Sequence, residues 1–210
     1  MVSLTNSFDD IIHGRRTIRK YDNRKRIPRE ELAKILTEAT SAPSSLNMQP
    51  WRFIVVESTK TKEKIKPLLT ANHIQCDTSA ALICLFGDLQ PHSNLTKIMQ
   101  GSVDYGTMTP DIRDQQIEKL TNYYQRVSQE QIKNTILLDG GLVSMNLMLV
   151  ARKYGYDTCP IGGFEKEQLA AALGLDSGRY LPLLIISIGK AAEKGYQSYR
   201  LPVADITEWL

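Results

Sequence analysis

The sequence predicts a single domain of the α+β class over residues 1–210. Three short apolar runs have the composition of strands, and longer segments repeat apolar residues at helical spacing. One of these helical segments is apolar on nearly every face. The chain shows no internal repeat, low-complexity tract or linker, and its 210 residues can bury a core without disulfides or a structural metal.

Composition and charge are those of an ordinary soluble globular protein. Apolar residues make up 42% and charged residues 23% of the chain, and the formal net charge is +3. That charge is too small to indicate nucleic-acid or membrane partners. Residues 1–6 contain no basic segment followed by an apolar run, so we expect no signal peptide and a cytoplasmic protein.

The first expected elements are two helices and a strand. One helix covers 7–14. The second opens at Pro28, which suits a first helical turn, and Pro43 stops it. Its buried stripe recurs at i, i+3, i+4 and i+7: Leu32, Ile35, Leu36 and Ala39. A strand is expected at 51–56, where aromatic and β-branched residues dominate.

The middle of the chain is expected to alternate between helix, strand and loop. We predict a helix over 59–72 that Pro67 interrupts, and a buried strand over 80–86. Residues 87–110 look rich in loops, and 111–127 look helical and polar.

The longest expected helix covers 129–153 and ends at Gly155. It is apolar nearly all round from Ile136 to Ala151, so it is expected to be a core helix or a subunit interface. We predict no membrane span, because polar residues and glycines interrupt it: Asp139, Gly140, Gly141, Ser144 and Asn146. A helix over 165–173 and a strand over 181–189 follow. The tail, 196–210, is too apolar to remain in solvent and is expected to dock on another surface.

The cysteines and histidines do not indicate a metal site. Cys76, Cys84 and Cys159 are widely spaced, and none forms a CxxC pair, so we expect buried, reduced thiols. The histidines lie far apart and are expected to be structural or surface residues: His13, His73 and His92.

A basic segment follows the first helix. Its cations are Arg15, Arg16, Arg19, Lys20, Arg24, Lys25, Arg26 and Arg29. The segment could be a solvated face, which is the usual role of a charge run, or a nucleic-acid tether, although no aromatic platform accompanies it. A third interpretation is a phosphate clamp, because arginine grips phosphate oxygens bidentately and the Thr17 hydroxyl can add a bond.

Two further stretches have the composition of a ligand site. Ser44, Ser45, Asn47 and Gln49 offer donors and acceptors between two stiffening prolines, Pro43 and Pro50. A heteroaromatic ring with alternating C=O and N–H groups needs such partners at fixed positions, although the stretch could also be a polar turn. In the sequence Pro160-Ile161-Gly162-Gly163, the glycines let backbone approach a ligand, or they simply begin a helix.

These motifs follow one another in a particular order. Arg15-Arg16-Thr17-x-Arg19 precedes the stretch from Pro43 to Trp51, then the long apolar helix, then Pro160–Gly163, and finally Arg200. The order resembles the nitroreductase superfamily of FMN-dependent NAD(P)H oxidoreductases, from about residue 8 to the C-terminus. The resemblance implies an intertwined α+β homodimer. It implies a central, mostly antiparallel sheet of four to five strands surrounded by helices, with a C-terminal tail that embraces the partner.

The resemblance also implies a role for each motif. Arg15, Arg16, Thr17 and Arg200 would hold the FMN phosphate, and Arg19 would lie near the pyrimidine edge of the flavin. The remaining expected cofactor-binding residues are Pro43, Ser44 and Ser45 from the other subunit, Asn47 and Gln49 nearby, Asn72 and Gln75 at the polar edge of the ring, and Pro160, Ile161, Gly162 and Gly163 facing flavin N5. Some members carry a glutamate at the position of Gly162 and a lysine at that of Ser198.

The implied activity is a two-electron ping-pong reduction. NAD(P)H would give a hydride to flavin N5, and a nitroaromatic, quinone or related small molecule would then accept it. The cofactor carries this chemistry, so no catalytic acid–base residue is expected. Alternatives on the same fold are an enone reductase, a dehalogenase, or a non-enzymatic FMN sensor or store. Candidate channel-lining residues, which could equally be ordinary packing tyrosines, are Tyr105, Tyr123 and Tyr124.

Overall fold

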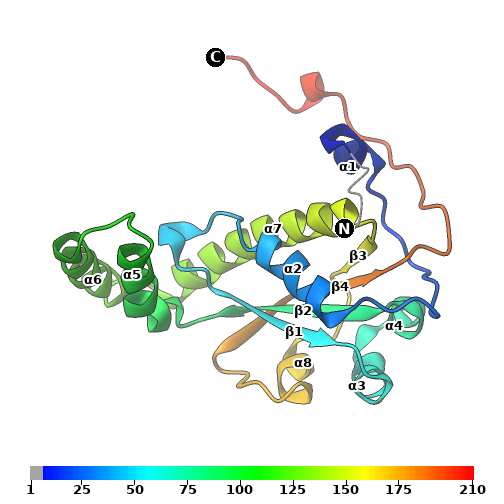
Figure 1. The fold of residues 1–210 in the computed structure, drawn as a ribbon, viewed down its shortest axis with the longest axis horizontal. Coiled ribbons are helices and arrows are strands. Elements are labelled where there is room, and N and C mark those ends of the chain that lie inside the picture. Colours follow the sequence, from blue (N-terminus) through cyan, green and yellow to red (C-terminus); the bar gives the residue numbers. More distant parts are fainter. Residues whose placement is uncertain (1–6) are drawn as a thin grey trace.

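The computed structural model describes residues 7–210, and its centre is a four-stranded antiparallel sheet in the order β1-β2-β4-β3 (Figure 1). The strands are β1 (Trp51–Val56), β2 (Ala81–Asp88), β3 (Asp157–Ile161) and β4 (Tyr180–Gly189). This architecture confirms the predicted α+β class and the antiparallel sheet. Residues 1–6 of the predicted domain lie outside the described residues.

The alternation of strand side chains divides the core into two layers. Ala81 and Ile83 of β2 face one layer, whereas Leu82, Cys84 and Phe86 face the other. Every residue of β2 is buried, because β2 lies between two strands and both faces of the sheet are covered by helices. The predicted strand at 80–86 is therefore confirmed, with an extension to Asp88.

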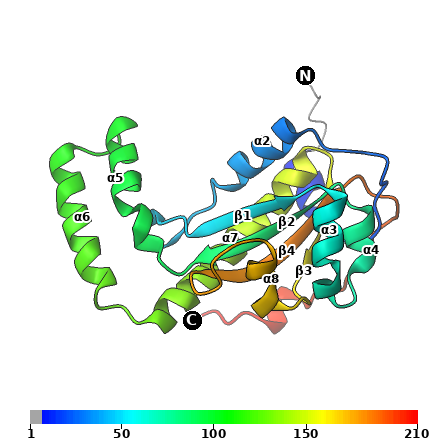
Figure 2. The same ribbon diagram turned by 90° about the horizontal axis from the view of Figure 1, so that it is seen from below.

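Helices α2 (Arg29–Ala39) and α7 (Gln129–Lys153) cover the first face of the sheet (Figures 1 and 2). Ser128 and Gln131 form a capping box that starts α7. A Cβ atom added to Gly140 would lie 2.5 Å from Leu183 Cδ1, so this glycine lets α7 approach β4 closely. The long helix expected over 129–153 is confirmed in full.

Helix α7 has the length and hydropathy of a segment that could cross a membrane. Half of its most apolar window is buried inside the molecule. Its buried residues include Val143, Leu147 and Ala151, of which the last two pack in the first core layer. This packing is that of a central core helix.

Three short helices cover the second face. They are α3 (Thr59–Ile65), α4 (His73–Thr78) and α8 (Lys166–Ala172). The helix expected over 59–72 is shorter than predicted, because α3 ends at Ile65 and a 3₁₀ turn, Lys66–Leu69, which contains Pro67, follows it. The next residue, Thr70, has φ of 45°. The three cysteines are buried and unpaired in disulfides, as predicted. Among residues 7–210, no group of three or more His, Cys, Asp or Glu side chains is placed to hold a metal ion.

Two helices project beyond the end of the sheet (Figures 1 and 2). They are α5 (Leu95–Asp104) and α6 (Pro110–Tyr124), which pack on each other around Leu95, Met99 and Leu120. The expectation of a loop-rich 87–110 was wrong, because this small apolar cluster, which Met48 completes, stabilises a helix that its sequence only weakly indicates. Helix α6 begins close to the predicted residue 111.

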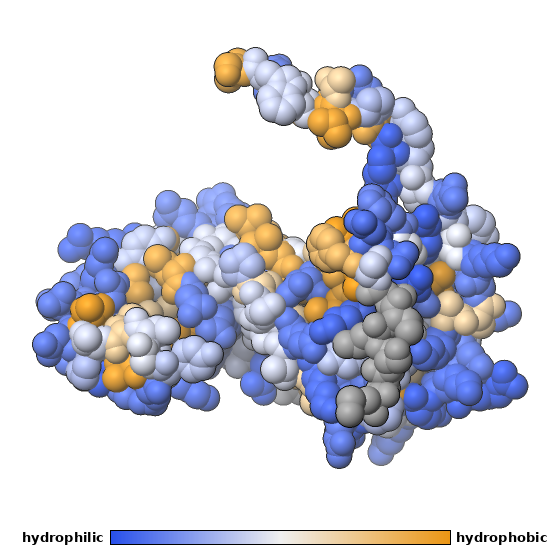
Figure 3. Space-filling model, turned by 45° about the horizontal axis from the view of Figure 1, so that its top comes forward, coloured by the Kyte–Doolittle hydropathy of each residue, from blue (hydrophilic) through white to orange (hydrophobic). Residues whose placement is uncertain are grey.

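The edge strand β3 was not predicted as a strand. It is short and contains Pro160, a residue that lacks an N–H group and is tolerated mainly at sheet edges. Helix α1 (Phe8–Gly14) precedes the basic segment as expected. The chain after β4 first lies along the basic segment, where the Ala192 N–H donates to the Lys20 carbonyl at 3.0 Å. Its final residues run away from the body, contain one 3₁₀ turn, Val203–Asp205, and leave their large apolar side chains exposed (Figures 1 and 3).

Candidate functional site

Positively charged side chains from the two ends of the chain meet around one surface cleft of ≈ 620 Å³. Arg15, Arg16 and Thr17 come from the segment after α1, and Arg200 comes from the tail. We call this hollow the basic cleft. Its lining is completed by Ile12, His13, Met145, Tyr196, Gln197 and Ser198. Guanidinium and hydroxyl donors that converge in this way can bind a phosphate group.

The basic segment is positioned by the free edge of β3. Thr17 forms an isolated parallel bridge with Thr158, and the Ile18 N–H donates to the Thr158 carbonyl at 3.1 Å. Ile18 and Tyr21 are buried, and the Tyr21 hydroxyl hydrogen-bonds the Ser187 hydroxyl at 2.9 Å. These anchors fix the backbone on which the arginines are carried.

Arg16 and Arg200 also contact nearby backbone. Arg16 Nη1 donates to the carbonyls of His13 at 2.6 Å and Arg15 at 2.9 Å, at the C-terminal end of α1. A cation at this position stabilises the negative end of a helix. Arg200 Nη1 donates to the Tyr199 carbonyl at 3.0 Å, and Arg200 is exposed. Part of the positive charge in the cleft therefore has a structural role.

Residues 160–163, which we call the glycine loop, begin at the end of β3 and finish with two exposed glycines, Gly162 and Gly163. The Gly163 carbonyl accepts from Thr70 Oγ1 at 2.9 Å and from Asn72 Nδ2 at 3.2 Å. A Cβ atom added at Gly162 would meet no atom within 4 Å, so its backbone borders open space. Because Ile161 is buried in the second core layer, its side chain faces away from that space.

A second polar cluster lies behind the glycine loop. Gln75 is buried, donates through Nε2 to Asn72 Oδ1 at 2.9 Å, and lies 4.0 Å from Cys159 Sγ. Burial raises the pKa of the Cys159 thiol, while Gln75 and the charge of Arg19 oppose that rise. The Arg19 backbone N–H is fixed by Glu193 Oε1 at 2.6 Å. The structure therefore places Arg19, Asn72 and Gln75 around one end of β3.

The polar stretch between α2 and β1, residues 43–49, forms a turn with several internal hydrogen bonds, which we call the serine–amide loop. The Gln49 N–H donates to Ser44 Oγ at 3.0 Å, and Gln49 Nε2 donates to the carbonyl of Asn47 at 3.2 Å. Leu46, Asn47 and Gln49 have φ of 53°, 56° and 48°, in the left-handed region. Such backbone costs on the order of 1–3 kcal/mol per residue and needs support from its surroundings.

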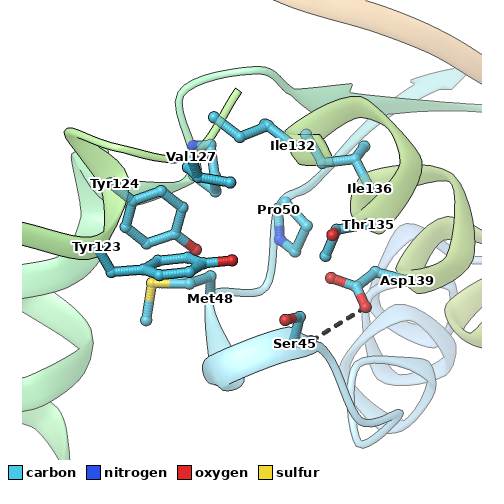
Figure 4. Close-up of a pocket in the computed structure, with 11 residues that line it drawn as sticks. Ser45, Met48, Pro50, Tyr123, Tyr124, Val127, Ile132, Thr135, Ile136 and Asp139 are labelled. Atoms are coloured by element: carbon cyan, nitrogen blue, oxygen red, sulfur yellow. Dashed lines mark hydrogen bonds between the residues drawn. The ribbon is translucent and has the colours of Figure 1, made fainter. Parts of the chain in front are cut away.

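The serine–amide loop and the basic cleft lie at different places along α7. The loop is held near the middle of the helix, where the Ser45 N–H donates to Asp139 Oδ1 at 3.0 Å (Figure 4). The basic cleft is bordered by Met145, and α1 lies over the C-terminal end of α7 (Figure 1). No hydrogen bond among residues 7–210 joins the loop to the cleft or to the glycine loop. One chain therefore does not bring all of the sequence-predicted residues together.

The candidate channel tyrosines have different surroundings. Tyr105 is 87% exposed and borders a groove of ≈ 590 Å³ between α5 and the serine–amide loop, together with Asn47, Gln49 and Lys97. Tyr123 and Tyr124 instead line a small cavity beneath Ser45 (Figure 4). Burial raises the pKa of Tyr124 to about 12. Of the three tyrosines, Tyr105 alone lines the groove beside the loop.

Two residues of the site were not found by sequence reasoning. Thr70 holds the glycine loop from a left-handed backbone conformation, and nothing in the sequence around it indicates this role. Asp139 did carry a signal, because a carboxylate inside an otherwise apolar helix is costly to bury. In the sequence alone, Asp139 counts only among the polar residues that interrupt an apolar helix.

A scan against family models matches residues 12–190 to one described as "Nitroreductase family". YdgI of Bacillus subtilis, provisionally named an NAD(P)H nitroreductase, is 50% identical over 98% of this chain and 98% of its own length. A relative named "CLA biosynthesis enone reductase", from Lactiplantibacillus plantarum, is 32% identical over 99% of this chain and 96% of its own length.

The fold of this chain is also similar to solved structures. A crystal structure from Exiguobacterium sibiricum, provisionally assigned as a nitroreductase and solved in complex with FMN, superposes with a TM-score of 0.96. The two sequences are 48% identical, and the superposition covers 98% of each chain.

Proposed function

The chain belongs to the nitroreductase family, and on that premise we propose that it reduces small-molecule acceptors in two-electron steps. It is an FMN-dependent oxidoreductase with NAD(P)H as electron donor, as the family, the relatives and the FMN-bound neighbour indicate. The specific acceptor and the division into two half-reactions belong to the proposal. Bound FMN would supply the chemistry of hydride transfer between the nicotinamide and the acceptor.

The residues of the site fit FMN. The basic cleft presents Arg15, Thr17 and Arg200 as donors for a phosphate dianion. The exposed backbone at Gly162 suits contact with a planar ring, because a Cβ atom added there would meet no atom within 4 Å. Asn72, at the same end of β3, donates through Nδ2 to the carbonyls of Leu69 and Gly163, but its Oδ1, which accepts from Gln75, has a second lone pair for a donor at the polar edge of such a ring.

The protein's contribution to the reaction is to bind and orient. Arg19 brings a positive charge to the end of β3 beside Cys159, and a cation there stabilises negative charge on a reduced ring. Thr70 and Asn72 fix the Gly163 carbonyl, and so hold the glycine loop in place one residue after the open space at Gly162. Neither role requires a side chain that gains or loses a proton.

We further propose that the active unit is a homodimer in which the serine–amide loop of one subunit completes the site of the other. Helix α7 exposes Leu137, Leu138, Leu142 and Met145, and the tail exposes further apolar residues that stand away from the body (Figure 3). A second copy of the chain would bury both surfaces. The separation of the loop from the basic cleft in one chain supports the same arrangement.

A nitroaromatic or a quinone is the acceptor class that we propose first. An enone is a second candidate, favoured by the 32% identity to an enone reductase over nearly the whole chain. The groove between α5 and the serine–amide loop offers Lys97 and Tyr105 as acceptor contacts in either case. The cytoplasmic location and the single-domain organisation stay predictions.

The observation that carries the proposal is the meeting of Arg15, Arg16, Thr17 and Arg200 in one cleft. Its test is anaerobic stopped-flow spectroscopy of the purified, FMN-loaded protein. We expect NADH or NADPH to bleach the yellow absorbance, and a nitroaromatic, quinone or enone to restore it. A protein that binds added FMN but is not reduced by either nucleotide would instead be an FMN sensor or store. A protein that binds no FMN would contradict the proposal.

A further inference from the structure

Helix α7 carries two polar side chains that tie it to the chain segment between α2 and β1. Asp139 accepts from the Ser45 N–H at 3.0 Å. Asn146 donates through Nδ2 to the Ala39 carbonyl at 2.9 Å and to Ser41 Oγ at 3.2 Å. The two residues are seven positions apart, so they lie two turns apart on one face of the helix. Asn146 thus fixes the end of α2, whereas Asp139 fixes the serine–amide loop itself.

Burying the carboxylate of Asp139 at this position costs free energy, because the charged group loses its hydration. Asp139 is 2% exposed, and its Oδ2 atom is buried without a hydrogen-bond partner among residues 7–210. The cavity around it is lined by Ser45, Pro50, Tyr123, Tyr124 and Ile136 (Figure 4). Burial raises the pKa of the Asp139 carboxyl, and the bond from Ser45 opposes that rise. A packing role alone would be served better by an apolar side chain.

The serine–amide loop needs an external anchor at the end that carries its serines. Three of its residues hold left-handed backbone, and their internal bonds join loop atoms only to one another. Met48 anchors the second half of the loop by burying its side chain against α5 and α6. For the first half, the bond from Ser45 to Asp139 is the one hydrogen bond from the described residues that reaches outside the loop.

We propose that Asp139 is a positioning residue: its buried carboxylate holds the Ser44–Ser45 end of the serine–amide loop in the conformation that binds the cofactor of the partner subunit. This inference rests on the proposed function, because it assumes that the loop meets FMN across a dimer. Asp139 itself acts only through the Ser45 backbone.

The first test compares three variants for FMN dissociation constant by fluorescence titration. Asp139→Ala removes the acceptor and should weaken FMN binding by about tenfold, the equivalent of one hydrogen bond. Asp139→Asn keeps an acceptor oxygen of the same shape and should bind FMN within about twofold of wild type. Asn146→Ala, the matched control on the same helix face, should also bind within about twofold. Wild-type affinity in Asp139→Ala, or equal weakening in Asp139→Asn, would overturn the inference.

The second test asks whether Asp139 acts across the dimer. A heterodimer is made by co-expressing differently tagged Asp139→Ala and Arg15→Ala subunits. If Asp139 supports the site of the partner, the Arg15→Ala subunit's basic cleft receives the loop of the Asp139→Ala subunit, so both defects fall in one site. The other site then has no defect and keeps wild-type FMN affinity. If it acts within its own subunit, each site carries one defect and neither binds FMN with wild-type affinity, which would overturn the inference.

A third measurement is independent of FMN. Amide hydrogen exchange should be faster across residues 44–49 in folded Asp139→Ala than in wild type or Asn146→Ala. Unchanged exchange in this segment would overturn the inference, even if Asp139→Ala proves too unstable for titration. Failure of wild-type protein to bind FMN would overturn the proposed function and, with it, this inference. Wild-type FMN affinity in folded Asp139→Ala would overturn the inference alone.

Discussion

The basic cleft gathers its donors from both ends of the chain, whereas the serine–amide loop takes its polar groups from one short stretch. The cleft carries its charge on arginines that range from half-buried to exposed. The loop instead holds strained backbone against the buried carboxylate of Asp139. One half of the proposed site therefore selects its ligand by charge, and the other half presents polar groups in a fixed shape.

The largest expected effect tests the proposal that each site is completed by the serine–amide loop of a second subunit. Leu138 is 66% exposed on α7, and Leu138→Asp would place a charge in the proposed dimer interface. We expect a monomer that binds FMN roughly a hundredfold more weakly or worse, because the serine–amide loop is lost together with its hydrogen bonds. Analytical ultracentrifugation and FMN titration measure the two outcomes.

The matched control for that experiment is Ile112→Asp on α6, where Ile112 is 46% exposed but lies away from α7 in the projecting helix pair. This variant should remain dimeric and bind FMN normally. A dimeric Leu138→Asp protein would remove Leu138 from the interface, and a monomer with full FMN affinity would contradict the composite site.

Arg15→Ala tests the basic cleft, the half of the proposed site that selects its ligand by charge. Loss of one charged hydrogen bond of about 1.5–3 kcal/mol corresponds to a tenfold to hundredfold weaker binding of FMN. The effect should shrink at high salt, because the cleft is open to solvent. Riboflavin, which lacks the phosphate, should bind both proteins equally. Isothermal titration with the two ligands measures the difference.

Arg24→Ala is the control within the same basic segment. Its guanidinium is exposed and forms an ion pair with Asp22 at 2.9 Å, away from the residues that line the cleft. We expect no change in FMN affinity for this variant. If Arg24→Ala weakened FMN as much as Arg15→Ala, the segment would act by its general charge and the cleft would have no specific role.

The smallest expected effect is a pH dependence of protein stability caused by Asp139, which holds the serine–amide loop. Because burial raises the pKa of Asp139 above its ordinary value of 3.8, the folded protein holds this proton more tightly than the unfolded chain. The contribution of Asp139 to stability therefore falls as the pH rises from about 4 through the raised pKa. Asp139→Asn should melt at a higher temperature than wild type at pH 7, and the difference should disappear below about pH 4.

Scanning calorimetry across that pH range measures the effect. The other titratable residues that line the cavity are Tyr123 and Tyr124, and burial raises the pKa of Tyr124 to about 12, far above that range. A stability difference that stays constant with pH would show that the ionisation of Asp139 does not contribute.

Much of the fold could be predicted because its signals are local. The stripe of α2, the apolar length of α7, and the runs of β1 and β2 each depend on neighbours in the sequence, and all four elements were found. The elements that were not predicted depend instead on contacts between residues that are far apart in the sequence. Helix α5 is stabilised by contacts with α6 and Met48, and β3 is an edge strand that contains Pro160.

The sequence by itself determined the family resemblance, the α+β class and the residue types that suit an anionic, planar ligand. Only the tertiary structure decided which of those residues meet. Arg200 joins the N-terminal arginines because the chain after β4 returns to the segment that lies along β3, and the serine–amide loop is held elsewhere by Asp139. The physical reason is that hydrophobic periodicity depends on residues close together in the sequence. The role of a buried carboxylate depends instead on the N–H group that donates to it, and that group belongs to a residue far away in the sequence.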